Sequence, residues 1–187
     1  STGDEKLKQK GDTIVAELAK CQDKLGSGYL SAYPEEFIDR VETGRRVWAP
    51  WYTLQKIYAG LLDVHVLCGN GQALEVLEKV CTWIQSRTDK LSDEQMERML
   101  GNEHGGMNDV LAELTAVTGN EKYLKLSQRF NHHAVLDPLA KREDRLTGLH
   151  ANTQFPKILG AARQHELTGD QNLHTIATFF WETVTKE

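Results

Sequence analysis

The sequence has little that would place it in a membrane, a fibre or a disordered tail. Its 187 residues include only 4 prolines, and no apolar run reaches the roughly 18 residues that a membrane-spanning helix needs. Charged residues make up 26% and hydrophobic residues 40%, which is typical of a soluble globular protein. The chain is long enough to bury a core, and the scarcity of proline leaves room for long helices.

A basic stripe is also absent. The 22 Lys and Arg residues are scattered among 27 Asp and Glu residues, giving a net charge of −5. No run of basic residues alternates with aromatic residues, as it would in a surface that binds nucleic acid. We therefore expect neither nucleic acid nor a membrane as a partner.

Cysteine is scarce as well, with only Cys21, Cys68 and Cys81. An odd number of three, without a C-x-x-C pair, excludes a disulfide framework and gives no sign of a metal site in this chain. All three are predicted to be buried helix residues, because free cysteine is often buried. The compartment stays open: the sequence begins with Ser and has no signal peptide, and a secreted or periplasmic parent whose signal has been removed is one alternative.

What the sequence does have is an internal repeat. Glycine followed by Asn or Asp occurs at 69–70, 119–120 and 169–170, with an interval of 50 residues, and Thr2-Gly3-Asp4 resembles a fourth copy. Glycine can end a helix in the left-handed conformation, and the next Asn or Asp can cap the following helix. Such short turns join antiparallel helices.

Apolar residues recur at helical spacing on both sides of these turns, as in Leu54, Tyr58 and Leu61. Ser92-Asp93-Glu94-Gln95 is a capping box that predicts one more short helix. The expected fold is therefore all-α, with a first helix over about 4–24 and then three antiparallel αα-hairpins. Because the first helix has no partner in the chain, we expect about three and a half hairpins of a larger helical repeat, cut at both ends.

The connections that lead into the hairpins are rich in Gly, Trp, His, Asn and Gln, and they span residues 44–55, 101–108 and 148–156. Gln55, His104 and Gln154 lie fourteen, fifteen and fifteen residues before the three turn glycines. If the hairpins pack side by side, these three side chains meet at one end. Neutral donors and acceptors beside Trp48 and Trp51 suit a sugar, although a loop role for His104 and core positions for both tryptophans are the simpler interpretation.

Four segments together resemble a signature of the β-L-arabinofuranosidases, which are glycoside hydrolase family 127 and relatives such as family 146, formerly a domain of unknown function. The segments are Val47–Leu61, Glu103–Met107, Phe130–Leu139 and Leu149–Lys157. The resemblance covers about 28–184 and follows the family order. It implies that residues 1–187 are a partial (α/α)6-barrel catalytic domain, roughly its N-terminal half.

The resemblance also implies a function. Members of the family carry out retaining hydrolysis of L-arabinofuranosides and related plant or bacterial glycans, with a zinc-bound cysteine thiolate as nucleophile and a glutamate as acid/base. Those catalytic and zinc-binding residues belong to the second half of the family pattern, so the resemblance implies an inactive chain whose full-length parent needs zinc. His104 and His150 match positions that contact the glycan, Gln154 is a weaker match, and Gln55 replaces the usual histidine.

Two other functional classes remain as alternatives. The chain could be a non-catalytic helical-repeat scaffold, which would present a long concave face without buried His and Gln, or part of another (α/α)-toroid sugar enzyme, such as an epimerase or lyase. The expected partners are a carbohydrate substrate and the remaining half of the barrel. Helix faces that this half would cover are also expected to allow self-association.

Overall fold

The computed structural model describes residues 3–186, which form ten helices and no strand, and this confirms the all-α prediction. Thr2, which belongs to the fourth predicted repeat, lies outside the described residues. The helices are α1 Glu5–Leu25, α2 Glu36–Glu42, α3 Pro50–Cys68, α4 Gly71–Thr88, α5 Asp93–Leu100, α6 Met107–Thr118, α7 Glu121–Arg129, α8 His133–Ala140, α9 Ala151–Thr168 and α10 Gln171–Lys186.

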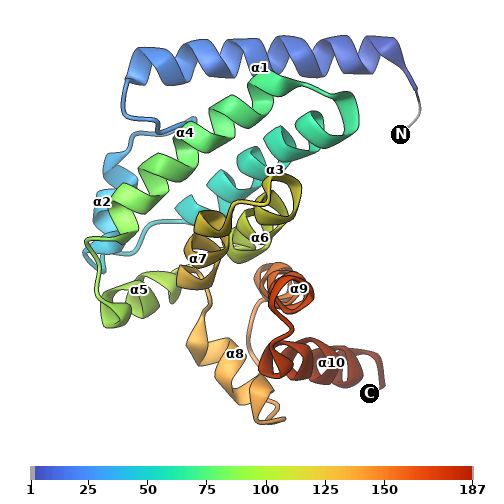
Figure 1. Ribbon diagram of the computed structural model, residues 1–187. Coiled ribbons are helices and arrows are strands. Elements are labelled where there is room, and N and C mark those ends of the chain that lie inside the picture. The colour runs from blue at the N-terminus through green and yellow to red at the C-terminus, as the bar shows by residue number, and fades with distance from the viewer. Residues whose placement is uncertain (1–2, 187) are drawn as a thin grey trace.

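Three helical hairpins follow one another from α3 to α10 (Figure 1). Two-residue turns join α3 to α4, α6 to α7 and α9 to α10, and the two helices of each pair pack together. The first helices of the hairpins also form a series, because α6 contacts both α3 and α9. The first helix of the chain, α1, packs across α4 and α3.

The turns form as the repeat predicts. Gly69, Gly119 and Gly169 have φ angles of 70°, 69° and 74°, which is the left-handed conformation that ends a helix. The side chain of Asn70 then accepts a hydrogen bond from the backbone N–H of Ala73 at 2.9 Å. Asn120 and Asp170 cap α7 and α10 in the same way, through the backbone N–H groups of Lys122 and Asn172.

Three shorter helices, α2, α5 and α8, fill the connections between the hairpins. The capping box predicted for α5 is confirmed, since Ser92 and Gln95 exchange hydrogen bonds of 2.8 and 3.2 Å. Of these, α2 begins at Glu35-Glu36, an acidic pair whose charges favour a helix start, whereas no sequence pattern predicted α8. In both helices the N-cap residue makes no side-chain hydrogen bond, and the first N–H groups of α8 donate instead to Glu97 of α5, which is distant in the sequence.

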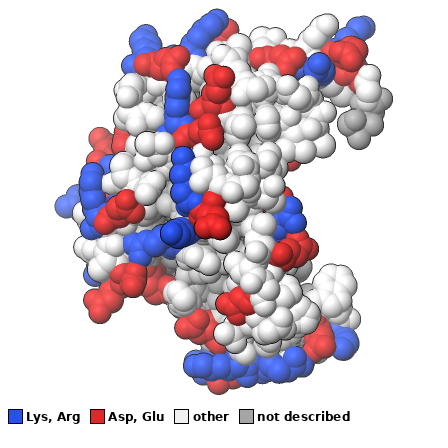
Figure 2. Space-filling model, viewed as in Figure 1, with Lys and Arg blue, Asp and Glu red and all other residues white. Residues whose placement is uncertain are grey.

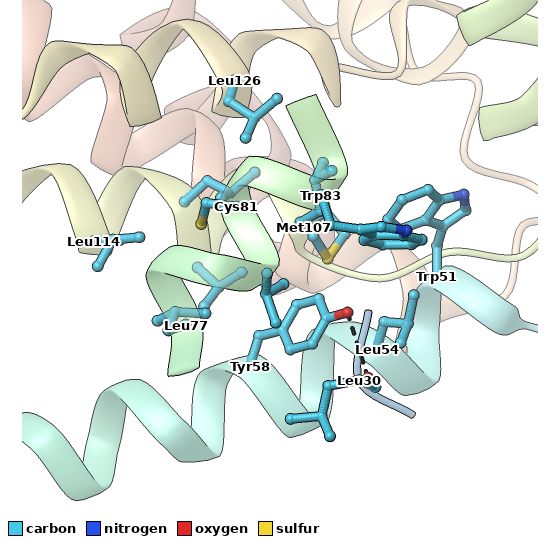
Figure 3. Packing of buried hydrophobic residues seen from close by; sticks show 14 of the residues in the cluster. Leu30, Trp51, Leu54, Tyr58, Leu77, Cys81, Trp83, Met107, Leu114 and Leu126 are labelled. Atoms are coloured by element: carbon cyan, nitrogen blue, oxygen red, sulfur yellow. Dashed lines mark hydrogen bonds between the residues drawn. The ribbon is translucent and has the colours of Figure 1, made fainter. Parts of the chain in front are cut away.

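The apolar core has two parts. The larger part joins α1 to α7, and Figure 3 shows Trp51, Trp83 and Met107 packed close together, with the Tyr58 hydroxyl donating to the carbonyl of Leu30 at 3.5 Å. A smaller cluster joins α8, α9 and α10 around Ile158, Ile176 and Phe180, among other residues. The first hairpins and the last hairpin therefore have separate apolar centres.

A polar seam lies between these two apolar clusters. We use this name for four side chains: Asn108 of α6, Ser127 of α7, Asn131 just after α7, and Gln164 of α9. Gln164 donates to the Ser127 hydroxyl at 2.7 Å, and that hydroxyl donates to the carbonyl of Asn108 at 2.5 Å. Gln164 and Asn131 also exchange amide hydrogen bonds of 2.9 and 3.0 Å. Because most of these groups are buried, the hydrogen bonds fix the position of α9 relative to α6 and α7.

Glycine makes this approach of α6 and α9 possible. Asn108 donates to the carbonyl of Lys157 in α9 at 2.9 Å, and its amide lies directly over Gly160. A Cβ atom at Gly160 would stand only 2.4 Å from Nδ2 of Asn108. The helices could not be this close with any other residue at position 160.

The surface mixes charges of both signs over the face seen in Figure 2, where no large area carries a single sign. Several large apolar side chains of α9 and α10 are exposed, among them Phe155, Leu159 and Trp181. None of the described helices has the length and apolar character needed to cross a membrane.

The prediction that all three cysteines are buried holds only for Cys81, because Cys21 is exposed and Cys68 is half-buried at the end of α3.

We predict opposite stability effects for two glycine-to-alanine changes. Gly160→Ala should lower the free energy of unfolding by about 2 kcal/mol or more, because the methyl group must displace the buried amide of Asn108. Gly60→Ala in α3 meets no atom within 4 Å and should raise it by about 0.5–1 kcal/mol, through lost backbone freedom in the unfolded chain. Urea denaturation measures both, and equal effects of the two changes would contradict the seam's role.

Candidate functional site

The loop between α5 and α6 carries His104 into the space between α3 and α9. Gly105 faces α3, where a Cβ atom would lie 3.0 Å from the Tyr52 ring and 3.2 Å from Oε1 of Gln55. Gly106 faces α9, where a Cβ atom would lie 2.8 Å from Pro156. The consecutive glycines therefore let the start of α6 fit between its two neighbours.

His104 is almost completely buried, with 1% of its surface exposed. Its Nδ1 atom lies 2.9 Å from the carbonyl of Leu100, so Nδ1 carries the proton and donates. Burial, together with the positive charge of Lys157 and the nearby His132 ring, holds the pKa of His104 well below its usual value. The ring is thus neutral, and its Nε2 is a hydrogen-bond acceptor without a partner among the described residues.

Gln55 and Gln154 lie at the same end of their helices as His104. Gln55 is buried in the second turn of α3, and its Oε1 atom likewise has no partner within residues 3–186. Gln154 is buried in the first turn of α9 and is fully engaged: its Oε1 accepts from Lys157 at 3.1 Å, and its Nε2 donates to Thr153 at 2.8 Å. The three connections therefore lie at one end of the helices, and a single pocket formed by their side chains stays a prediction.

A buried lysine links Gln154 to the histidines. The ammonium group of Lys157 donates to Nδ1 of His132 at 3.0 Å, so the proton of that ring is on Nε2, which lies 3.5 Å from a carboxylate oxygen of Glu97. Glu97 also accepts from two backbone N–H groups at the start of α8, His133 and Ala134. The His104 and His132 rings are 5.4 Å apart between centroids.

The charges in this network shift its pKa values. Burial lowers the pKa of Lys157 to about 8, against the attraction of Glu97. Burial and the Lys157 charge lower the pKa of His132 to about 4.

We did not predict Lys157 or His132 as site residues. The signal was the position of Lys157 three residues after Gln154, which puts both on one face of α9.

His150 differs from the other three candidates. It is exposed and occupies the N-cap position of α9, where its carbonyl accepts from the Thr153 side chain at 2.9 Å. The neighbouring Asn152 donates to the Tyr52 hydroxyl at 2.8 Å, which ties the start of α9 to α3. The structure therefore brings Gln55, His104 and Gln154 together in a buried region and leaves His150 at the surface of the same helix end.

The core position predicted for both tryptophans is wrong for one of them. Trp51 is buried in the larger core, whereas Trp48 is 90% exposed. Trp48 belongs to an open cavity of about 780 Å³ formed by the loop that precedes α3, the loop that follows α5, and adjoining residues of α2 and α5. None of the four sequence-predicted sugar-binding residues lines this cavity.

The described residues contain no group of three His, Cys, Asp or Glu side chains that could hold a metal ion. Cys21, Cys68 and Cys81 come from three different helices. Burial raises the pKa of the Cys81 thiol to about 12, so it is protonated at neutral pH. These cysteines do not fit a zinc-bound thiolate.

Comparison with known proteins gives one family. The family model described as "Beta-L-arabinofuranosidase, GH127 catalytic domain" matches residues 1–187. A search of curated proteins finds no match to the chain.

The Lys157 network gives a prediction for the pH dependence of stability. Between pH 8 and the ordinary lysine pKa of 10.5, the folded protein has released the Lys157 proton while the unfolded chain still holds it. The Lys157 contribution to the free energy of unfolding should therefore rise by up to about 3 kcal/mol over this window, and Lys157→Met should lose this gain relative to the wild type. The exposed control Lys90→Met should keep it.

Urea denaturation at several pH values measures the slope, and NMR titration of the His132 ring gives an independent readout. Without the nearby ammonium charge, the pKa of His132 should rise from about 4 toward its usual value. An unchanged His132 titration in Lys157→Met would contradict the network.

Proposed function

The chain belongs to the glycoside hydrolase family 127 β-L-arabinofuranosidase catalytic-domain family, and from this premise we propose that it forms part of the sugar-binding pocket for an L-arabinofuranoside or a related glycan. The observation that carries the proposal is a pair of buried acceptors. Nε2 of His104 and Oε1 of Gln55 both lack partners among the described residues, and Gly105, directly after His104, packs against Gln55.

Buried acceptors of this kind suit sugar hydroxyl groups. An acceptor buried without a donor costs free energy, and a ligand O–H group that donates to it removes this cost. His104 stays an acceptor at neutral pH because its pKa is held low, and a glutamine amide has no charge at any pH. A neutral polyol therefore matches these two acceptors better than an anion, which has fewer protons to donate.

Gln154 and His150 have different proposed parts in the same pocket. The amide of Gln154 is held by Lys157 and Thr153, so it presents a fixed orientation at the start of α9. His150 is exposed at the N-cap of α9 and is free to contact a sugar at the mouth of the pocket. Gln55, where the family signature usually has His, can donate and accept a hydrogen bond but cannot transfer a proton, so we propose a binding role for it.

The reaction itself is proposed for the parent enzyme rather than for this chain. The family resemblance implies retaining hydrolysis with a cysteine nucleophile on zinc and a glutamate acid/base. The three cysteines here do not fit that group, so we assign no step of the reaction to them. We propose that these groups come from elsewhere in the parent and that this chain supplies sugar contacts.

The proposed contacts can be tested by titrating the protein with a methyl L-arabinofuranoside and following backbone amide shifts by NMR. Gln55→Leu and His104→Phe each remove hydrogen-bonding atoms and keep most of the buried volume. Each should weaken binding about tenfold, as expected for the loss of one hydrogen bond of about 1.4 kcal/mol. The exposed control His174→Ala should bind as the wild type does.

Circular dichroism and thermal melting check that the two buried variants remain folded. Wild-type binding with unchanged affinity in both folded variants would remove the basis for the pocket. If His104→Phe unfolds, Gln55→Leu still decides, because its two polar atoms come from a separate helix.

The isolated chain should release no arabinose from an aryl β-L-arabinofuranoside, with or without added zinc. The reason is that burial raises the pKa of the Cys81 thiol and that the described residues contain no group of His, Cys, Asp or Glu side chains that could hold a metal ion. Release of the aryl group is measured by absorbance at a high protein concentration. Zinc-dependent turnover that survives Cys→Ala changes at all three positions would place the catalytic groups elsewhere in this chain.

A further inference from the structure

An open cavity beside the proposed sugar pocket has no part in the function described so far. It is formed by the loop over 44–49, which leads into α3, and by residues 101–103, which lead into His104. Arg98 of α5 and Val41 of α2 complete its wall. With a volume of about 780 Å³, it is in the size range of ligand-binding pockets.

The backbone of this cavity holds Trp48 out in solvent. Ala49, the next residue, has φ 46° and ψ 44°, a left-handed conformation that is unfavourable for a residue with a Cβ atom. The loop is fixed on the other side by Asn102, which donates to the carbonyl of Val47 at 2.7 Å. A large apolar ring that is 90% exposed, and held so by a strained backbone, is typical of a binding surface.

The arginines of the cavity are the second observation. Arg45, Arg46 and Arg98 line it and are exposed. Within residues 3–186, these three have no ion pair, whereas every other arginine has a carboxylate partner: Arg40, Arg87, Arg129, Arg142, Arg145 and Arg163. Glu103 is the one carboxylate of the lining, so the cavity carries three positive charges against one negative charge.

We propose that this arginine–tryptophan cavity, lined by Arg45, Arg46, Trp48, Arg98 and Glu103, binds a uronate unit of an acidic glycan. The indole ring of Trp48 offers a flat apolar face for the C–H side of a sugar ring. Guanidinium groups bind carboxylates through two parallel hydrogen bonds, which fits the acid group of a uronate. A neutral sugar would use the ring alone and leave the arginines unpaired.

The position of the cavity connects it to the proposed function, on which this inference rests. Glu103 borders the cavity and is followed directly by His104, and Ala49 borders it and is followed by α3, which carries Gln55. A glycan that places a neutral arabinofuranose against His104 and Gln55 could therefore place its acidic backbone against Trp48. The substrate class is then an arabinofuranoside attached to a uronate-containing glycan.

The test uses a trimer of galacturonic acid and the same trimer as its methyl ester, which has the same rings without the charge. Binding is measured by isothermal titration calorimetry at low salt. The free acid should bind at least tenfold more tightly than the ester, and its affinity should fall as salt is added. A trisaccharide of uncharged sugars that carries sulfate groups serves as a second anion and should bind more weakly than the uronate.

Matched variants separate the cavity from general effects of charge and aromatic surface. Trp48→Ala should weaken binding of the acid at least tenfold, and Arg98→Gln about threefold to tenfold. Trp181→Ala removes the other exposed tryptophan, 65% exposed on α10, and Arg145→Gln removes one positive charge from the loop before α9. Both controls should bind like the wild type, and circular dichroism checks the fold of all four.

The proposal is overturned if the free acid does not bind, if the ester binds equally well, if the sulfated sugar binds more tightly, or if Trp181→Ala has the effect expected of Trp48→Ala. Its failure is distinct from failure of the proposed function. Gln55→Leu should leave uronate binding unchanged, and Trp48→Ala should leave binding of a free methyl arabinofuranoside unchanged. Each ligand therefore reports on its own site.

Discussion

The contact between α6 and α9 determines where Gln154 and Lys157 lie relative to the other groups of the candidate site. Gly160 lets Asn108 approach the α9 backbone, and the hydrogen bonds of Ser127 and Gln164 hold the two helices in that register. The first hairpins and the last have separate apolar clusters, so apolar packing alone does not fix one against the other. The directional hydrogen bonds fix the last hairpin against the first ones, because a polar contact of this kind specifies one arrangement more strictly than apolar surfaces do. Lys157, whose carbonyl takes part in this contact, is thereby held beside His132 and Gln154.

The parts of the fold that depend on local chemistry could be predicted from the sequence. The three turn glycines and the Asn or Asp after each act within a few residues, and so does the capping box at Ser92. The common register of Gln55, His104 and Gln154 followed from the repeat, because nearly equal spacing from the turn puts residues at similar heights near the start of packed hairpins. That the four candidates bind a sugar, and that the chain is half of an (α/α)6 barrel, stay predictions.

The parts that depend on tertiary contacts could not be predicted. Trp48 was expected in the core, and its exposure follows from the left-handed Ala49 and the hydrogen bond from Asn102, a residue more than fifty positions away. Lys157 belongs to a residue type that is ordinarily exposed, and it is buried because α9 packs against α6 and its ammonium group lies against His132. In the sequence the Gly105-Gly106 pair is only part of a motif, whereas the structure gives each glycine a separate steric reason, one against α3 and one against α9.

The charges at this end of the molecule are arranged so that the two proposed sites select different chemistry. Around His104, the ammonium group of Lys157 is buried and already donates hydrogen bonds to Gln154 and His132, so it is not available to an anion. Its positive charge lowers the pKa values of His104 and His132 and so keeps both rings neutral. In the neighbouring cavity, three arginines are exposed, unpaired and accessible to a carboxylate. A buried, engaged cation favours a neutral ligand, whereas exposed, unengaged cations favour an acidic one. One glycan fits both sites only if it has a neutral sugar attached to an acidic chain. The different charges of the two adjacent sites are therefore the reason why the proposed substrate combines a neutral and an acidic part.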